Sequence, residues 1–207
     1  MAPKTPYKDA QVGDIRYIDI NGDGWLNEDD RVEVGRSTTP EMMFAFSGDM
    51  NWKGLDFSVQ FQGAALCDKF LLHAWGNGAE DANPLTRPWY GGWDNAPLFL
   101  VENSWRPDNP NAAFPRLSTS PISNNSLASD YWKKNGAYLR LKNVTLGYTL
   151  PKKWTKKALI ENLRFYVSGN NLLTFTEFKY LDPESPNVIN GYYPQQRTFV
   201  FGVDVTF

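Results

Sequence analysis

Residues 43–52 read MFAFSGDMNW and residues 55–66 read LDFSVQFQGAAL, with only Lys53 and Gly54 between them. In both runs, apolar side chains alternate with small or polar ones, so every second residue lies on the same face. A period of two predicts β-strands, and a two-residue connection that contains glycine predicts a tight hairpin turn. These two runs therefore predict an antiparallel hairpin of long strands, and they decide the fold class.

Three further runs alternate in the same way: residues 137–150, 163–175 and 197–207. Each has one apolar face, and the opposite face carries Asn, Ser, Thr, Arg or Asp. In the first of these runs, Leu139 and Leu141 have the opposite parity to Val144 and the apolar residues after it, which predicts a bulge or a change of environment near Asn143. Two shorter elements are also predicted, a strand at 14–18 and a helical turn at 153–161.

The lengths of the strands and loops favour a membrane barrel over a soluble sandwich. The five strands run to about 10–13 residues, which suits a tilted crossing of a bilayer, whereas strands of globular proteins average about 5–6. Connections alternate between short (53–54, 151–162) and long (67–135, 176–196), as in outer-membrane barrels. The smallest such barrels have about eight strands, so the predicted fold class is all-β, antiparallel strands of a large transmembrane β-barrel.

Composition excludes several other classes of protein. The formal net charge is −2, so the chain lacks a basic field for binding nucleic acid. One cysteine and one histidine, Cys67 and His73, allow neither an internal disulfide nor a Cys/His zinc site. Two acidic pairs, Glu80 with Asp81 and Asp182 with Glu184, have the composition of a glycosidase pair, but nearby carboxylates in a loop are usually solvated, so no catalytic residue is predicted.

Residues 19–30 read DINGDGWLNEDD and fit the pattern of a calcium loop. Oxygen donors occupy positions 1, 3, 5, 9 and 12, glycine occupies the sharp turn at position 6, and position 7 offers a backbone carbonyl. The predicted ligands of this calcium-type loop are Asp19, Asn21, Asp23, Trp25, Asn27 and Asp30. Position 12 is aspartate instead of glutamate, which predicts a weaker site, and the competing interpretation is a turn closed by its own Asn and Asp side chains.

The long segment 67–135 has no sustained period and is rich in tryptophan and proline. Loops of this length usually serve a function, and indole rings stack on sugar rings. The sugar-binding candidates in this segment are Trp75, Trp89, Trp93 and Trp105. They leave a second function open, that of a soluble calcium-stapled β-sheet carbohydrate-binding module.

Residues 131–148, YWKKNGAYLRLKNVTLGY, resemble the W-x-x-x-G-x-Y-L-R-L-K-N-V-T-L-G-Y segment of SusC/RagA-family TonB-dependent outer-membrane transporters. Residues 163–175 resemble the strand that follows it in that family. Further similar segments are residues 181–184, 193–195, the loop at 13–31 and the final Phe207. The resemblance spans nearly the whole chain.

The resemblance implies that residues 1–207 are the C-terminal part of the barrel, with the plug and N-terminal barrel strands outside this chain. It implies a nutrient importer in the outer membrane of Bacteroidota-type bacteria, in contact with outer-membrane lipid and with no enzymatic activity. The cargo would be glycans or peptides, a SusD-like surface lipoprotein would form the lid, and TonB would act through the plug. If Phe207 lies at the periplasm, segment 67–135 is a long extracellular loop.

Overall fold

The computed structural model describes residues 10–71, 98–118, 122–185 and 195–207. The chain divides into two compact units, which are described separately. One unit contains the five long strands, and the other contains the described residues of the 10–36, 69–71, 98–118 and 122–134 segments.

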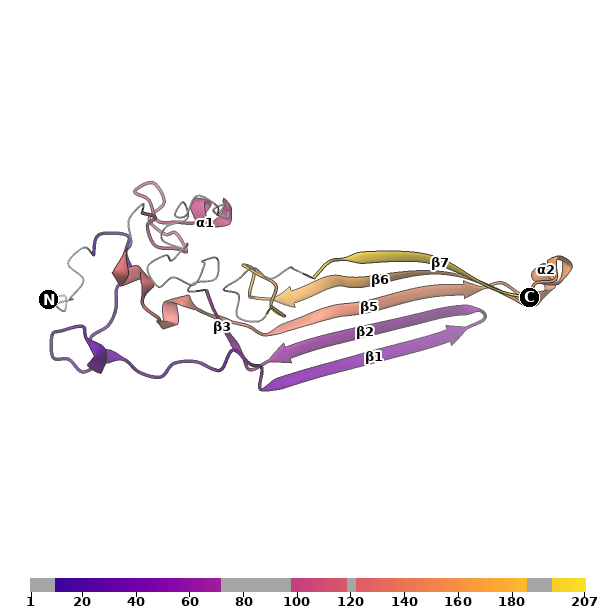
Figure 1. Cartoon of the computed structure of the whole chain (residues 1–207), viewed down its shortest axis with the longest axis horizontal. Helices are drawn as coiled ribbons and strands as arrows, with labels where there is room; N and C mark the ends of the chain where they lie inside the picture. The colour runs from indigo at the N-terminus through magenta and orange to yellow at the C-terminus, as the bar shows by residue number, and fades with distance from the viewer. Residues whose placement is uncertain (1–9, 72–97, 119–121, 186–194) are drawn as a thin grey trace. The chain divides into compact units, whose positions relative to one another are not determined.

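The first unit is a five-stranded antiparallel sheet in the order β1-β2-β5-β6-β7 (Figure 1). Its strands are β1 (Met42–Trp52), β2 (Leu55–Ala65), β5 (Tyr138–Thr149), β6 (Asn162–Thr176) and β7 (Thr198–Thr206). These are the five strands that the alternation predicts, so the all-β prediction is confirmed. Within the described residues each strand pairs with the long strand next to it in sequence, as in a barrel wall that this chain does not close.

The turn between β1 and β2 has the predicted two residues. Lys53 and Gly54 both have positive φ, 48° and 89°, which is the backbone of the mirror-image turns that suit twisted hairpins. The carbonyl of Gly54 also accepts a hydrogen bond of 2.7 Å from the amide of Thr149, so the turn is tied to the neighbouring strand.

The predicted bulge is present, because the register of β5 shifts against both of its neighbours. Against β2, the partners of Gln60 and Phe61 are Asn143 and Leu141, which leaves Lys142 as an extra residue. Against β6, the shift again lies between Leu141 and Asn143. An extra residue in one strand explains why Leu139 and Leu141 join the apolar face despite their opposite parity.

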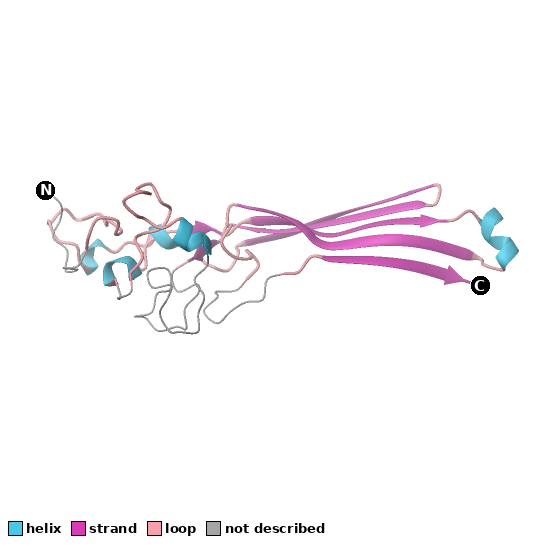
Figure 2. Ribbon diagram, turned by 90° about the horizontal axis from the view of Figure 1, so that it is seen from above, coloured by secondary structure: helices cyan, strands magenta, loops and turns pink. Residues whose placement is uncertain are grey.

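The predicted helical turn between β5 and β6 is also present. It consists of α2 (Lys152–Thr155) and a 3-10 turn, η4 (Lys156–Ala158), which ends at Leu159 in the left-handed region with φ 59°. Figure 2 shows this turn at the same end of the sheet as the C-terminus. Among the described residues, no helix is long and apolar enough to cross a membrane.

The second unit has short elements around a small core. Its helical elements are η1 (Glu28–Asp30), α1 (Leu98–Glu102), η2 (Ser123–Ser126) and η3 (Asp130–Trp132). Two strands of three residues, β3 (Asp68–Phe70) and β4 (Lys133–Asn135), form a separate small sheet. Segment 67–135 is therefore not structureless where it is described. The buried core side chains of this unit are Leu71, Leu100, Phe114, Ile122 and Trp132.

The prediction of a strand at 14–18 is wrong. The backbone groups of Ile15 bond to side chains instead of to another strand: its amide donates to Asn125 Oδ1 at 2.9 Å, and its carbonyl accepts from Asn124 Nδ2 at 2.7 Å. The segment has no strand assignment as a result, although its alternation is that of a strand.

Candidate functional site

The five-stranded sheet has two chemically different faces, as the strand register shows. One face is apolar on all five strands and includes Phe46, Phe57, Leu146, Val167 and Phe201. Its large side chains are exposed, for example Phe46 at 52% and Phe201 at 80%. The other face is polar and includes Asp49 of β1, Gln60 of β2, Thr145 of β5, Ser168 of β6 and Asp204 of β7. We take this polar face as the candidate functional surface.

The middle of the polar face is uncharged. Asn143 Nδ2 donates to Asn170 Oδ1 at 2.9 Å, and the hydroxyls of Thr145 and Ser168 are hydrogen-bonded at 2.8 Å. Amide and hydroxyl groups both donate and accept hydrogen bonds. This part of the face therefore suits water and neutral polar molecules.

An ion cluster lies on the polar face toward the end of the sheet where β1 turns into β2. Arg164 makes a bidentate contact with Asp56, Nε to Oδ1 at 2.9 Å and Nη2 to Oδ2 at 2.6 Å, and its Nη1 lies 2.8 Å from Asp204 Oδ2. The pair Asp56–Arg164 crosses β5 at Gly147, which lies directly opposite Asp56 in the register. A Cβ at Gly147 would lie 2.5 Å from both carboxylate oxygens of Asp56.

We expect Gly147→Ala to weaken this ion cluster and lower the stability of the receptor by about 1–3 kcal/mol, because the new methyl group displaces the Asp56 carboxylate from Arg164. The measurement is the thermal unfolding midpoint in detergent. The matched control is Gly48→Ala, because a Cβ there meets only Val59 Cγ1, at 3.7 Å. Equal unfolding midpoints for the two variants would show that the ion cluster does not depend on glycine at position 147.

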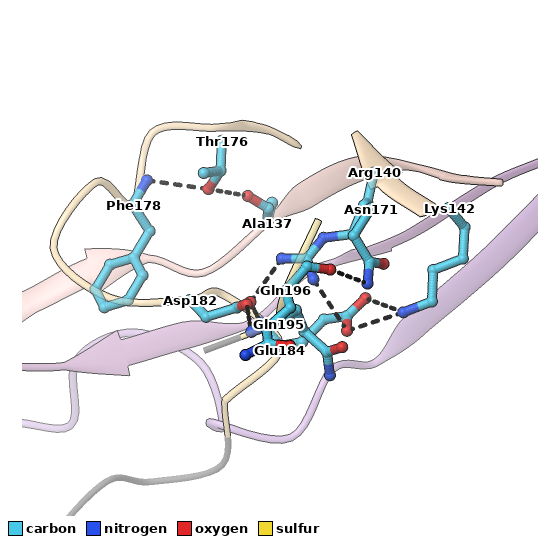
Figure 3. A network of polar contacts seen from close by, with 10 residues as sticks. All are labelled: Ala137, Arg140, Lys142, Asn171, Thr176, Phe178, Asp182, Glu184, Gln195 and Gln196. Atoms are coloured by element: carbon cyan, nitrogen blue, oxygen red, sulfur yellow. Dashed lines mark hydrogen bonds and ion pairs between the residues drawn. The ribbon is translucent and has the colours of Figure 1, made fainter. Parts of the chain in front are cut away.

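A second ion cluster lies at the bulge of β5 (Figure 3). Arg140 Nη2 lies 2.6 Å from Asp182 Oδ1, and Arg140 Nη1 lies 3.3 Å from Glu184 Oε2. Lys142 Nζ also lies 3.3 Å from Glu184 Oε2. These four residues are called the charge quartet below; they carry two positive and two negative charges, so the quartet is neutral.

Three of the four side chains of the quartet are nearly buried, and that of Lys142 is 30% exposed. The side chains of Arg140, Asp182 and Glu184 are 3%, 8% and 12% exposed. Burial acts to raise the pKa of the Asp182 carboxyl, but hydrogen bonds from Arg140 and from the amides of Glu184 and Gln195 outweigh it and hold that pKa below its ordinary value. A lowered pKa keeps Asp182 ionised at neutral pH, and its contribution to stability is lost only when the pH falls through that lowered value.

The quartet is the part of the site that sequence reasoning missed. Asp182 and Glu184 were considered as an acidic pair, and the structure places each within ion-pair distance of Arg140. The available signal was the change of parity near Asn143, because the extra residue there moves Arg140 from the apolar face, where alternation counted back from Val144 would place it, to the polar face. The other pair considered, Glu80 and Asp81, lies outside the described residues.

The calcium-type loop is held by bonds from its side chains to its own backbone. The two carboxylate oxygens of Asp19 accept from the amides of Gly22 and Gly24 at 2.7 and 2.8 Å. Asp23 Oδ1 accepts from the amide of Trp25 at 2.7 Å. These contacts close the turn on its own aspartate side chains.

The end of the same loop is closed by Asp30 and Asn27. Asp30 accepts from the amides of Asn27 and Ile20, at 2.9 and 2.8 Å, and the bond from Asn27 is the main reason that the pKa of Asp30 lies below its ordinary value. Asn27 Oδ1 accepts from the amide of Asp29 at 2.6 Å, which caps η1.

The position-3 residue, Asn21, accepts from the amide of Asp23 at 2.9 Å, so it also takes part in closing the loop. Within the described residues, no group of three or more His, Cys, Asp or Glu side chains is arranged to hold a metal ion. Calcium binding by this loop stays a prediction.

Three of the four predicted sugar-stacking residues, Trp75, Trp89 and Trp93, lie outside the described residues. The fourth, Trp105, packs its indole ring against Gly13, where a Cβ would lie 2.3 Å from Trp105 Cε3. Gly13 has a φ of 94°, so both its backbone and the space above it require glycine. Trp105 thus has a packing contact in this structure, and a role in sugar binding stays a prediction.

Comparison with known proteins gives a consistent answer. The chain is 33% identical to TonB-dependent receptor P26 of Formosa agariphila, over 97% of this chain and 20% of that protein. It is 26% identical to TonB-dependent receptor SusC of Bacteroides thetaiotaomicron, over 92% of this chain and 17% of that protein. A solved structure of the RagAB peptide transporter matches 89% of this chain and 19% of the solved chain, with 27% identity and a TM-score of 0.61.

The chain belongs to the SusC/RagA type of TonB-dependent receptors. A search of protein-family models gave no match. The chain spans about a fifth of the length of the curated receptors that it matches. SusC/RagA-type receptors are outer-membrane proteins, so the five strands form part of an outer-membrane β-barrel, as the alternation and the loop lengths predict.

Proposed function

We propose that this chain forms part of the wall of a TonB-dependent importer that takes up glycans or peptides across the outer membrane. The observation that carries the proposal is the sheet with two faces, apolar and exposed on one side and polar on the other. An apolar face suits lipid, and a face of amides, hydroxyls and paired charges suits a wet interior. The matched solved structures are described as a peptide transporter and a peptide importer, which favours peptides or molecules of similar size as the cargo.

The proposal includes partners and an orientation. A SusD-like surface lipoprotein would cover the extracellular side, and TonB would supply energy through the plug. Loops 19–42, 67–135 and 176–196 would then face the outside, and turns 53–54 and 151–162 the periplasm. The chain would contribute to transport and not to catalysis, since its relatives are receptors and transporters.

The test is to purify the receptor that contains this chain from native outer membranes in mild detergent and to identify what co-purifies. We expect a stoichiometric surface lipoprotein, and we expect a deletion strain to lose uptake of one class of labelled glycans or peptides. Recovery of the chain from the soluble fraction as a monodisperse protein without detergent would instead support the calcium-stapled carbohydrate-binding module.

We also propose that the calcium-type loop binds calcium in a structural role, with a Kd of about 0.1–1 mM, as in extracellular calcium modules. Titration calorimetry of the purified receptor with calcium chloride is the measurement. Asp23→Ala removes the position-5 ligand and is expected to abolish the heat of this site, because hard oxygen ligands supply the affinity. Asp29→Ala, at position 11, is the matched control and should bind as the wild type does. Identical titrations for all three proteins would exclude the site.

A further inference from the structure

The segment that follows β6 folds back over the polar face of the sheet. We define the strap as residues 177–185, all of which are described. Its carboxylates Asp182 and Glu184 reach Arg140 and Lys142 of β5, at the bulge (Figure 3). Arg140 stands opposite Gln62 of β2 and Thr174 of β6 in the register, and it alternates with the leucines of the apolar face. The strap therefore docks on the side of the sheet that faces the interior of the barrel.

Both ends of the docked segment are also held. At its start, the amide of Phe178 donates to Thr176 Oγ1 at 3.0 Å, the hydroxyl of Thr176 donates to the carbonyl of Ala137 at 2.8 Å, and the Phe178 side chain is 3% exposed. Asp182 accepts a bond of 3.0 Å from the amide of Gln195, where the chain returns toward β7. The strap is thus held by the buried side chain of Phe178 and by the ionic contacts of Asp182 and Glu184.

The bulge of β5 sets the geometry of these ionic contacts. Alternation counted back from Val144 would place both Lys142 and Arg140 on the apolar face. The extra residue in β5 instead sets Arg140 opposite Gln62 on the polar face, and both basic side chains reach Glu184. On β6, Asn171 takes a left-handed backbone with φ 53°, and its Nδ2 donates to the carbonyl of Gln196 at 3.0 Å. The irregular part of both strands therefore serves to bind the two arms of the connection.

We propose that the strap is a charge-latched gate: docked, it narrows the interior of the barrel, and when the quartet separates, it leaves the polar face of β5 and β6 open to cargo. The gate rests on the proposed import function. The neutral quartet makes docking possible in a nearly dry site, since removal of one buried charge leaves its partner uncompensated.

The docked state also has a cost that favours opening. Arg140 Nε and Nη1 are buried and have no hydrogen-bond partner with good geometry in the described part of the chain, and opening would expose both to water. Loss of one charge of the quartet would therefore strongly destabilise the docked state. Even with all four charges present, two buried nitrogens of Arg140 lack hydrogen bonds to the described residues in that state. Such a balance is what a two-state element requires.

The test is hydrogen–deuterium exchange of the full receptor in detergent, with the isosteric variant Asp182→Asn/Glu184→Gln. Amides of the strap are expected to exchange about tenfold faster or more, while those of β5 and β6 keep their protection. Asp49→Asn, an exposed carboxylate on the same face in β1, is the control and should leave the strap unchanged. Unchanged exchange in the double variant would overturn the latch.

A second variant tests the latch in case the double variant unfolds the sheet. If β5 and β6 also exchange faster in the double variant, Lys142→Gln decides the question, because it removes only the partner that is 30% exposed. We expect about twofold to fivefold faster exchange of the strap in this variant, and no change would overturn the latch.

Uptake separates the gate from the importer. Cells with the double variant should take up the labelled cargo about twofold faster or more, since the open fraction limits passage. Faster strap exchange with unchanged or slower uptake would overturn the gate alone. Absence of uptake in the wild type would overturn the importer, and the exchange result would still report on the latch.

Discussion

Arginine in place of Val59 is expected to remove most of the folded receptor from the outer membrane, whereas arginine in place of the next residue, Gln60, is tolerated. Val59 lies on the apolar face near the middle of β2, and Gln60 lies on the polar face. A basic side chain that faces lipid near the bilayer midplane costs about 2–4 kcal/mol, and the same side chain that faces a wet interior costs little. The measurement is the amount of folded receptor in outer-membrane fractions.

The two substitutions form a matched pair, because they place the same side chain one residue apart in one strand. They differ only in the face on which the charge stands. Equal loss of both variants would mean that β2 is buried on both faces, as in a sheet that other layers cover on both sides. Equal tolerance would mean that neither face meets lipid, and both results would contradict the place of this sheet in a barrel wall.

The strands were predictable because their two faces meet different surroundings. An alternation such as Phe57, Val59 and Phe61 against Asp56, Ser58 and Gln60 is readable without any knowledge of partners. The bulge was predictable for the same reason, since an extra residue leaves a visible change of parity near Asn143.

Contacts between distant segments were not predictable. Residues 14–18 alternate like a strand, but their backbone bonds go to Asn124 and Asn125, more than 100 residues away in sequence. The partners Asp56 and Arg164 are likewise 108 residues apart. Local pattern reports which face a residue occupies, and it does not report which charged residue lies beside it on that face.

The candidate site divides in the same way. The pattern of oxygen donors at 19–30 is local, and the structure closes that turn with the side chains of Asp19 and Asp23. The quartet depends on pairing between β5 and the strap, so the carboxylates of Asp182 and Glu184 were visible in the sequence only as a loop pair. Their role follows from the position of Arg140, which lies within ion-pair distance of both carboxylates.

Asn125→Leu is expected to release the segment that leads into the calcium-type loop, at a cost of about 2–5 kcal/mol, because two buried polar partners lose their bonds at once. The Asn125 side chain is fully buried, its Oδ1 accepts from the amide of Ile15 at 2.9 Å, and its Nδ2 donates to Asp14 Oδ1 at 2.8 Å. Leucine has a similar volume but supplies neither group. The measurement is hydrogen–deuterium exchange of residues 10–18 in the intact receptor.

The control for this prediction is Asn103→Leu in the same unit, where the side chain makes one exposed hydrogen bond, to the carbonyl of Phe99 at 2.7 Å. Water replaces that bond, so exchange of residues 10–18 should stay as in the wild type. If the calcium-type loop binds calcium as proposed, the released segment is expected to weaken that binding as well, since its end joins the first predicted ligand, Asp19. Protected amides in the Asn125 variant would mean that the bond of Arg116 to Asp14, at 2.8 Å, is enough to hold the segment alone.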